Sequence, residues 1–187
     1  MNGIDDLIQD ATRRMDKSVE STQVEFNTVR TGRASAALLD RIQVDYYGQP
    51  TPIKQLATIN VPEPRMLTVQ PFDPSSIKEI ERAILESELG LTPSNDGKVI
   101  RLPIPQLTEE RRKELVKIVR QIAEEGRVAI RNVRRDADKH LKDLKSKGDV
   151  GEDDERRAED RVQKLTDEHT SKIDEILKRK EAEITEV

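Results

Sequence analysis

The residues with the clearest capacity for chemistry are cations spaced between positions 113 and 135. Six of them recur at steps of three, four or seven residues, which places them on one face of a helix: Lys113, Lys117, Arg120, Arg127, Arg131 and Arg134. Arginine outnumbers lysine from position 120 onward, and its planar guanidinium forms paired hydrogen bonds with phosphate oxygens. No aromatic residue lies among them, so base stacking is not expected. The pattern favours the backbone of structured RNA.

A solvated helix face would produce the same cations without any RNA. Glu124 and Asp138 lie among them, as acidic residues do on ordinary exposed helices. The charge balance is nevertheless local: residues 108–147 hold 13 Lys and Arg but 8 Asp and Glu, in a chain whose net charge is -4. Both interpretations stay open from these residues alone. In either case we place the cations opposite a buried stripe that includes Ile122, Ala129 and Val133.

Catalytic chemistry has few candidates in this chain. His140 and His169 lie far apart on helical stretches, and we expect both at a helix surface or boundary. The acidic run at residues 152–155 could bind a hard cation or serve a hydrolase, but carboxylates at a helix start interact favourably with the helix dipole. There is no cysteine and no glycine-rich phosphate loop. We therefore predict a protein that is not an enzyme and needs no cofactor or metal.

The elements that position the cations are long helices. Apolar residues recur at steps of three and four over residues 4–29, 115–144 and 162–184. Gly148 to Gly151 separates the second stretch from the third. Amphipathic helices of this length must bury their apolar stripes against one another. Residues 1–30 and 108–187 are therefore predicted to form a long three-helix bundle that is discontinuous in sequence.

Residues 31–107 have a different character, because they contain all nine prolines. Alternation predicts strands at residues 41–47, 53–59, 66–70 and 98–102. Asp73 and Pro74 suit the start of a short helix that Gly90 would end. The sequence therefore predicts an α+β protein, in which a small β/α/β domain is inserted after the first helix of the bundle.

Two linkers join the predicted domains, and we expect them to act as a hinge. The first contains Arg30, Thr31, Gly32 and Arg33, and the second contains Pro103 and Pro105. Short linkers with little shared surface usually permit one domain to rotate against the other.

Composition indicates where the protein acts in the cell. The chain has 187 residues, of which 37% are charged and 2% aromatic, and the apolar periodicity favours exposed helices over disorder. No apolar run approaches the roughly 20 residues that span a bilayer. The acidic first ten residues do not resemble a secretion signal. We expect a cytoplasmic monomer with no membrane partner.

Seven short stretches follow one another in a specific order along nearly the whole chain. They are residues 29–35 (VRTGRAS), 44–52 (VDYYGQPTP), 89–91 (LGL), 100–105 (IRLPIP), 107–112 (LTEERR), 128–137 (VAIRNVRRDA) and 162–167 (VQKLTD). Each stretch alone is a weak signal, but the set is specific. By these stretches the chain resembles the bacterial ribosome recycling factor family.

That resemblance implies an L-shaped molecule, with a three-helix bundle and a β/α/β domain joined by a hinge. It implies a translation factor that binds the large ribosomal subunit after termination and, with elongation factor G and GTP, separates the subunits for reuse. The arginines through which family members engage ribosomal RNA match Arg112, Arg131 and Arg134. The GTPase is the partner, so no nucleotide site is expected here. A coiled-coil scaffold or chaperone remains the alternative that the charged helices alone would allow.

Overall fold

The computed structural model describes residues 3–185. The chain divides into two compact units: one comprises the segments up to Arg30 and from Glu109 onward, and the other is Thr31–Thr108.

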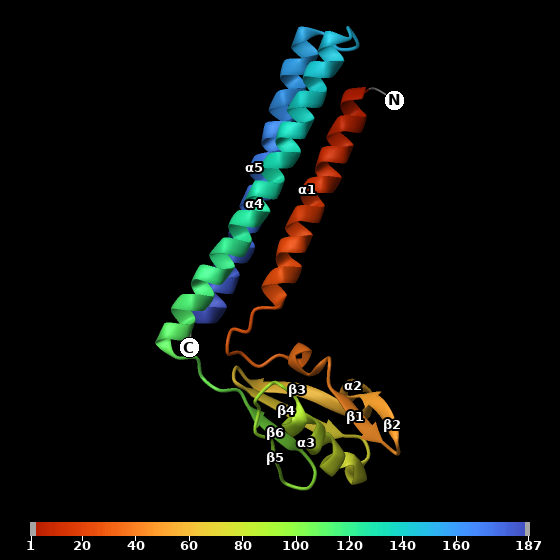
Figure 1. Cartoon of the computed structure of the whole chain (residues 1–187), viewed down its shortest axis with the longest axis vertical. Helices are drawn as coiled ribbons and strands as arrows, with labels where there is room; N and C mark the ends of the chain where they lie inside the picture. Colours follow the sequence, from red (N-terminus) through yellow and green to blue (C-terminus); the bar gives the residue numbers. More distant parts are fainter. Residues whose placement is uncertain (1–2, 186–187) are drawn as a thin grey trace. The chain divides into compact units, whose positions relative to one another are not determined.

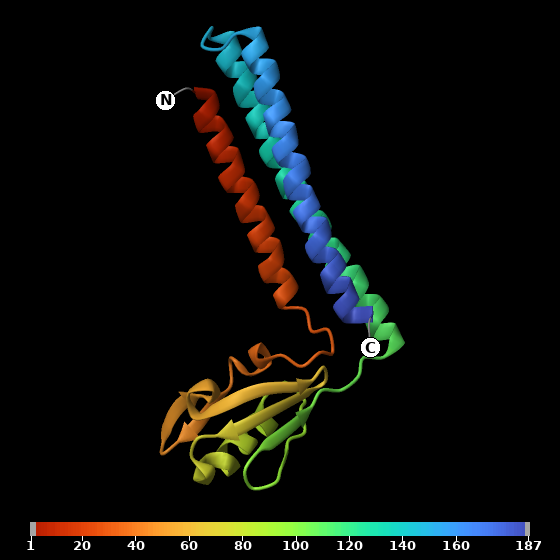
Figure 2. The ribbon, with the colours of Figure 1, turned by 180° about the vertical axis from the view of Figure 1, so that it is seen from behind.

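The first unit is a bundle of three helices within the described residues. Its members are α1 (Gly3–Asn27), α4 (Glu109–Ser146) and α5 (Glu152–Thr185). They run side by side, and each contacts the other two (Figure 1, Figure 2). Between α4 and α5 the chain reverses at Gly148, whose φ is +77°. There the amide of Asp149 donates to the Leu144 carbonyl at 3.0 Å, which is the helix-ending motif that glycine favours.

The bundle core contains large apolar side chains from all three helices, with Met15 and Phe26 on α1, Ile130 on α4 and Ile173 on α5 fully buried. The helices approach closely at Gly126, where an added Cβ would lie 2.8 Å from Cδ1 of Ile173 and would also overlap the Thr22 hydroxyl.

The buried stripe of α4 agrees with the predicted one at Val133 but differs at two other positions. Ala123, Gly126 and Ile130 are buried, whereas Ile122 and Ala129 are only half-buried. The prediction failed at Ile122 and Ala129 because it left out Ala123 and Gly126, small residues that let neighbouring helices approach.

The second unit is an antiparallel β structure with one principal helix. Its strands are β1 (Gln43–Tyr46), β2 (Gln49–Pro52), β3 (Ala57–Glu63), β4 (Met66–Pro71), β5 (Ser94–Asn95) and β6 (Ile100–Pro103). Strands β1 and β2 form a hairpin, and the others form a sheet in the order β3-β4-β6-β5. Its helical segments are two 3-10 turns (Ala36–Leu39 and Pro74–Ser76), α2 (Ile53–Leu56) and α3 (Ile77–Glu86). Helix α3 packs against β1 and buries Ile80 and Ile84.

Three local predictions for this unit need correction. The predicted strand 53–59 is a helical turn, α2, followed by β3. Helix α3 ends at Glu86 rather than at Gly90, because the Ser87 backbone amide and hydroxyl both donate to the Ile84 carbonyl. No strand was predicted at residues 49–52, yet β2 pairs there with β1 despite its two prolines, since an edge strand does not need every amide.

Candidate RNA-binding surface

The cations of α4 lie beside the buried stripe, not opposite it. At 100° per residue, Arg127 lies roughly 60° and Arg131 roughly 100° around the helix from the buried Ile130. The predicted position was wrong because it centred the stripe near Ile122 and Ala129, roughly 80–100° to the other side. Arg120 and Arg127 therefore border α5 instead of facing away from the bundle.

Two of these arginines connect α4 to α5. Arg120 Nε lies 2.7 Å from Glu181 Oε1, and Arg127 donates to Asp174 Oδ1 from Nε at 2.9 Å and from Nη2 at 2.6 Å. Only 24% of the Arg127 side chain is exposed. Burial disfavours its charge, but the hydrogen bonds and charges of Asp174 and Glu124 outweigh burial and raise the pKa of Arg127. Arg120 and Arg127 thus contribute to helix packing.

Arg131 has a more open environment than Arg127. Its Nη2 donates to Glu124 Oε1 at 2.6 Å, and 43% of its side chain is exposed. The other carboxylate oxygen of Glu124 accepts from Arg127 Nη1 at 3.2 Å. Hydrogen bonds from Arg131 and then Arg127 hold the pKa of Glu124 below its usual value. Within residues 3–185, the remaining donors of Arg131 have no other hydrogen-bond partner.

The other predicted RNA contacts have no ion pair with any residue that the structure describes. Lys117 is exposed on α4. Arg112 is half-buried in the first turns of the helix, where its Nε is buried and has no partner among the described residues. Arg134 is half-buried and lies near Asp138, whose pKa is raised by burial although Arg134 and Lys142 act to lower it.

The predicted hinge residues lie at Arg30, the end of a segment of the first unit, and in the linkers and at the edge of the second unit. Gly32 has φ +77°, and a Cβ there would lie 2.9 Å from Cγ of Leu107, so the two linkers pack together. Arg30, Arg33 and Pro105 are exposed, Thr31 is half-buried, and Pro103 ends β6.

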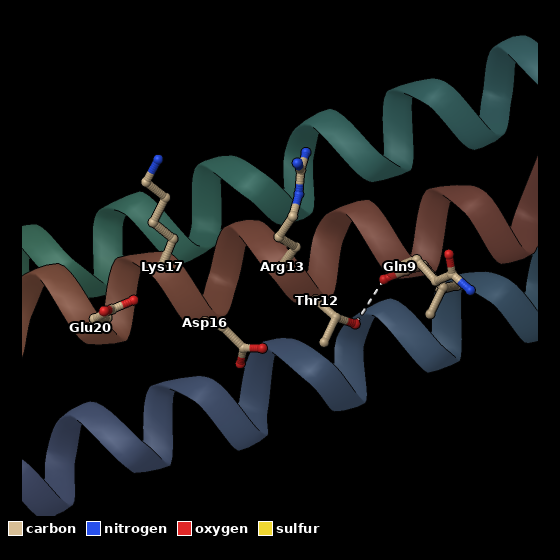
Figure 3. A pocket seen from close by; sticks show the side chains of 7 residues that line it. Gln9, Thr12, Arg13, Asp16, Lys17 and Glu20 are labelled. Carbon is tan, nitrogen blue, oxygen red and sulfur yellow. Dashed lines mark hydrogen bonds between the residues drawn. The ribbon is translucent and has the colours of Figure 1, made fainter.

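A hollow on α1 offers no convergent group of reactive side chains. It is lined by residues of α1 itself, among them Thr12, Arg13, Asp16 and Lys17 (Figure 3). Thr12 donates to the Ile8 carbonyl, and Arg13 pairs with Asp10 at 2.6 Å. Figure 3 shows Asp16 directed toward α5.

The two histidines lie in different environments. His140 is exposed, as predicted. The expectation for His169 was wrong, because this side chain is buried in the bundle with Nε2 2.6 Å from Asp16 Oδ1 and Nδ1 2.7 Å from the Leu165 carbonyl. A polar partner on α1 allows an imidazole to lie within the apolar stripe of α5.

Within residues 3–185, no group of three or more His, Asp or Glu side chains is arranged to hold a metal ion. No helix in this range is long and apolar enough to cross a membrane.

Comparison with known proteins identifies the family. The family model described as ribosome recycling factor matches residues 22–185. The chain belongs to the ribosome recycling factor family. The ribosome-recycling factor of Rubrobacter xylanophilus is 57% identical over 187 residues, which is 100% of both chains. That of Geobacillus kaustophilus is 58% identical over 97% of this chain and 98% of its own.

Solved structures of ribosome recycling factors agree with the fold. A solution structure of the ribosome recycling factor is 44% identical, with a TM-score of 0.77 over 100% of both chains. Another structure describes the T. thermophilus ribosome recycling factor and the E. coli elongation factor G bound to the E. coli post-termination complex. The match is 48% identical, with a TM-score of 0.65 over 97% of this chain and 98% of the other. The predicted combination of a helical bundle and a small β domain is therefore confirmed.

The sequence placed Glu124 among the cations, but its pairing with the arginines, and the two acidic partners on α5, were not predicted. Glu124 lies three residues before Arg127 and seven before Arg131, so its position on the same helix face could have been deduced from spacing. Asp174 and Glu181 belong to α5, and their contacts depend on how α4 and α5 pack.

Proposed function

We propose that this chain binds the post-termination ribosome and, with elongation factor G and GTP, promotes separation of the subunits for reuse. The observation that supports this most strongly is the family match across the chain, including relatives that it covers end to end. The T. thermophilus family member occurs with elongation factor G and a post-termination complex, which supports the same pairing here.

The contact with the ribosome is assigned to ribosomal RNA of the large subunit. Arg131 offers a partly exposed guanidinium with unused donors. Arg112 and Arg134 have no ion pair with another described residue, so binding phosphate would not cost them one. Arg127 is a secondary contact, because its donors are shared between Asp174 and Glu124. Arg120 directs only its Nε to α5 and adds a further exposed guanidinium. Lys117 extends the surface along α4.

The protein acts in this proposal as a cytoplasmic monomer and not as an enzyme. Elongation factor G supplies GTP hydrolysis, so the chain itself needs neither a cofactor nor a catalytic residue. Its own contribution is to present charge on a rigid bundle and to move the inserted unit about the linkers at Gly32 and Pro103.

A subunit-separation assay tests the proposal. Post-termination ribosomes are mixed with this protein, elongation factor G and GTP, and light scattering records the loss of intact ribosomes. We expect separation only when all three components are present. Salt-independent binding to ribosomes without any separation would instead favour a scaffold or chaperone.

A further inference from the structure

Glu124 contacts two arginines that use their donors differently. A guanidinium has five N–H donors. Arg127 directs Nε and Nη2 to Asp174 and Nη1 to Glu124, and is three-quarters buried. Arg131 directs only Nη2 to Glu124. Arg127 is therefore committed to the protein, whereas most donors of Arg131 remain available.

These contacts form a continuous chain from α5 to the exposed guanidinium. Asp174 on α5 fixes Arg127, Arg127 fixes one oxygen of Glu124, and the other oxygen of Glu124 holds Arg131 at 2.6 Å. A long arginine side chain loses rotamer freedom when it binds a phosphate, and restraint before binding reduces that loss. Because only Nη2 of Arg131 is held by Glu124, the other N–H groups of the guanidinium can form the paired contact with phosphate oxygens.

We infer that Glu124 is a positioning residue, which orients Arg131 toward an RNA phosphate by tying it to the α4–α5 contact. This inference depends on the proposed RNA-binding function. Glu124 itself touches no RNA in this arrangement.

A competing interpretation, in which Glu124 only repels RNA, predicts the opposite change in RNA affinity. A carboxylate beside a phosphate site repels RNA and occupies a donor of Arg131, so its removal would tighten binding if electrostatics alone mattered. Positioning predicts weaker binding after the same change, even though the protein becomes more positive. The direction of the effect therefore separates the two.

Glu125 provides a matched control. It is the next residue on α4, it is exposed, and its hydrogen bond at 3.4 Å is to Gln121 rather than to an arginine. Glu125→Ala and Glu124→Ala remove the same charge from adjacent positions. Only Glu124→Ala releases Arg131.

The experiment measures affinity for purified bacterial large ribosomal subunits, with folding checked by circular dichroism and thermal unfolding. The variants are Glu124→Ala, Glu125→Ala, Arg131→Ala and the double variant Glu124→Ala/Arg131→Ala. We expect Glu124→Ala to weaken binding about 3–10-fold and Glu125→Ala to leave it unchanged or slightly tighter. Once Arg131 is absent, adding Glu124→Ala should weaken binding no further, because the two residues act together.

Each other outcome overturns the inference. Equal or tighter binding by Glu124→Ala means that the carboxylate competes with RNA or is idle. The same loss with and without Arg131 means that Glu124 acts through another group. If Arg131→Ala weakens binding and Glu124→Ala does not, only the positioning role fails. If Arg131→Ala also has no effect, the proposed RNA contact fails with it.

Discussion

The carboxylate of Asp16 on α1 lies 2.6 Å from Nε2 of His169 on α5, which is 2% exposed. The other ring nitrogen lies 2.7 Å from the Leu165 carbonyl, so both nitrogens of a buried imidazole face an oxygen. Bridging two helices in this way makes His169 a structural residue of the bundle.

His169→Ala should therefore reduce the free energy of unfolding by about 1–3 kcal/mol, because it removes a buried polar partner and leaves a cavity. Urea denaturation measures this. The variant should still separate subunits under conditions in which it is folded. His140→Ala, at an exposed position on α4, is the control and should change stability by less than about 0.5 kcal/mol. Equal effects of the two changes would contradict the structural role.

Gly126→Ala should destabilise the bundle even though alanine favours helix by about 0.8–1.0 kcal/mol over glycine. The new methyl group would overlap Thr22 and lie 2.8 Å from Ile173, so the helices must separate. Overpacking of this kind costs typically 1–3 kcal/mol. Thermal unfolding of Gly126→Ala and of the double variant Gly126→Ala/Thr22→Ala is the measurement. The second change removes one of the two clashes and should recover part of the loss; a stabilised Gly126→Ala protein would refute the close contact.

Acid should lower the stability of the inserted unit by protonating the Asp96 carboxylate. Backbone hydrogen bonds from Val99 and then Lys98 hold its pKa below the usual 3.8. A lowered pKa in the folded state means that the carboxylate adds stability above pH 3.8, and that this is lost as pH falls through the folded-state value. Asp96→Asn should thus be less stable than wild type at pH 7 and closer to it near pH 3. A stability difference that stays constant across this range would contradict the assignment.

Rotation about the linkers should appear as a broad distance distribution between spin labels, one on α4 and one on α3. We expect the distribution to narrow when the protein binds ribosomes. A single narrow distance that ribosome binding leaves unchanged would show that the linkers do not act as a hinge.

Gly32→Ala provides a second test of the hinge, because it crowds Leu107 where the linkers meet. Gly148→Ala is the matched control, since both glycines have φ +77° but an added Cβ at Gly148 meets nothing within 4 Å. Both variants should lose about 1–2 kcal/mol from backbone strain. Only Gly32→Ala should change the distance distribution; the same distribution in both variants would show that the contact with Leu107 does not govern the motion.

The sequence predicted what depends on local periodicity and turn chemistry. The long helices, the break at Gly148 and the Asp73–Pro74 helix start follow from patterns of a few residues, and the structure confirms them. The buried side of α4 was misplaced only at Ile122 and Ala129, because the prediction did not weigh small residues such as Ala123 and Gly126, whose burial depends on the close approach of neighbouring helices. The same tertiary packing decides which arginines are engaged by Asp174 and Glu181.

Ribosome affinity as a function of salt concentration tests whether the arginines of α4 bind ribosomal RNA. The proteins compared are wild type, Arg131→Ala, Arg134→Ala and, as a control on the exposed surface of α5, Lys172→Ala. A charge-assisted contact contributes about 1.5–3 kcal/mol, so each arginine variant should bind roughly tenfold or more weakly. Each should also show a salt dependence shallower by about 0.7–0.9 in the slope of log affinity against log salt, while Lys172→Ala changes little. Arginine variants that bind as tightly as wild type at every salt concentration would show that these cations are only a solvated surface.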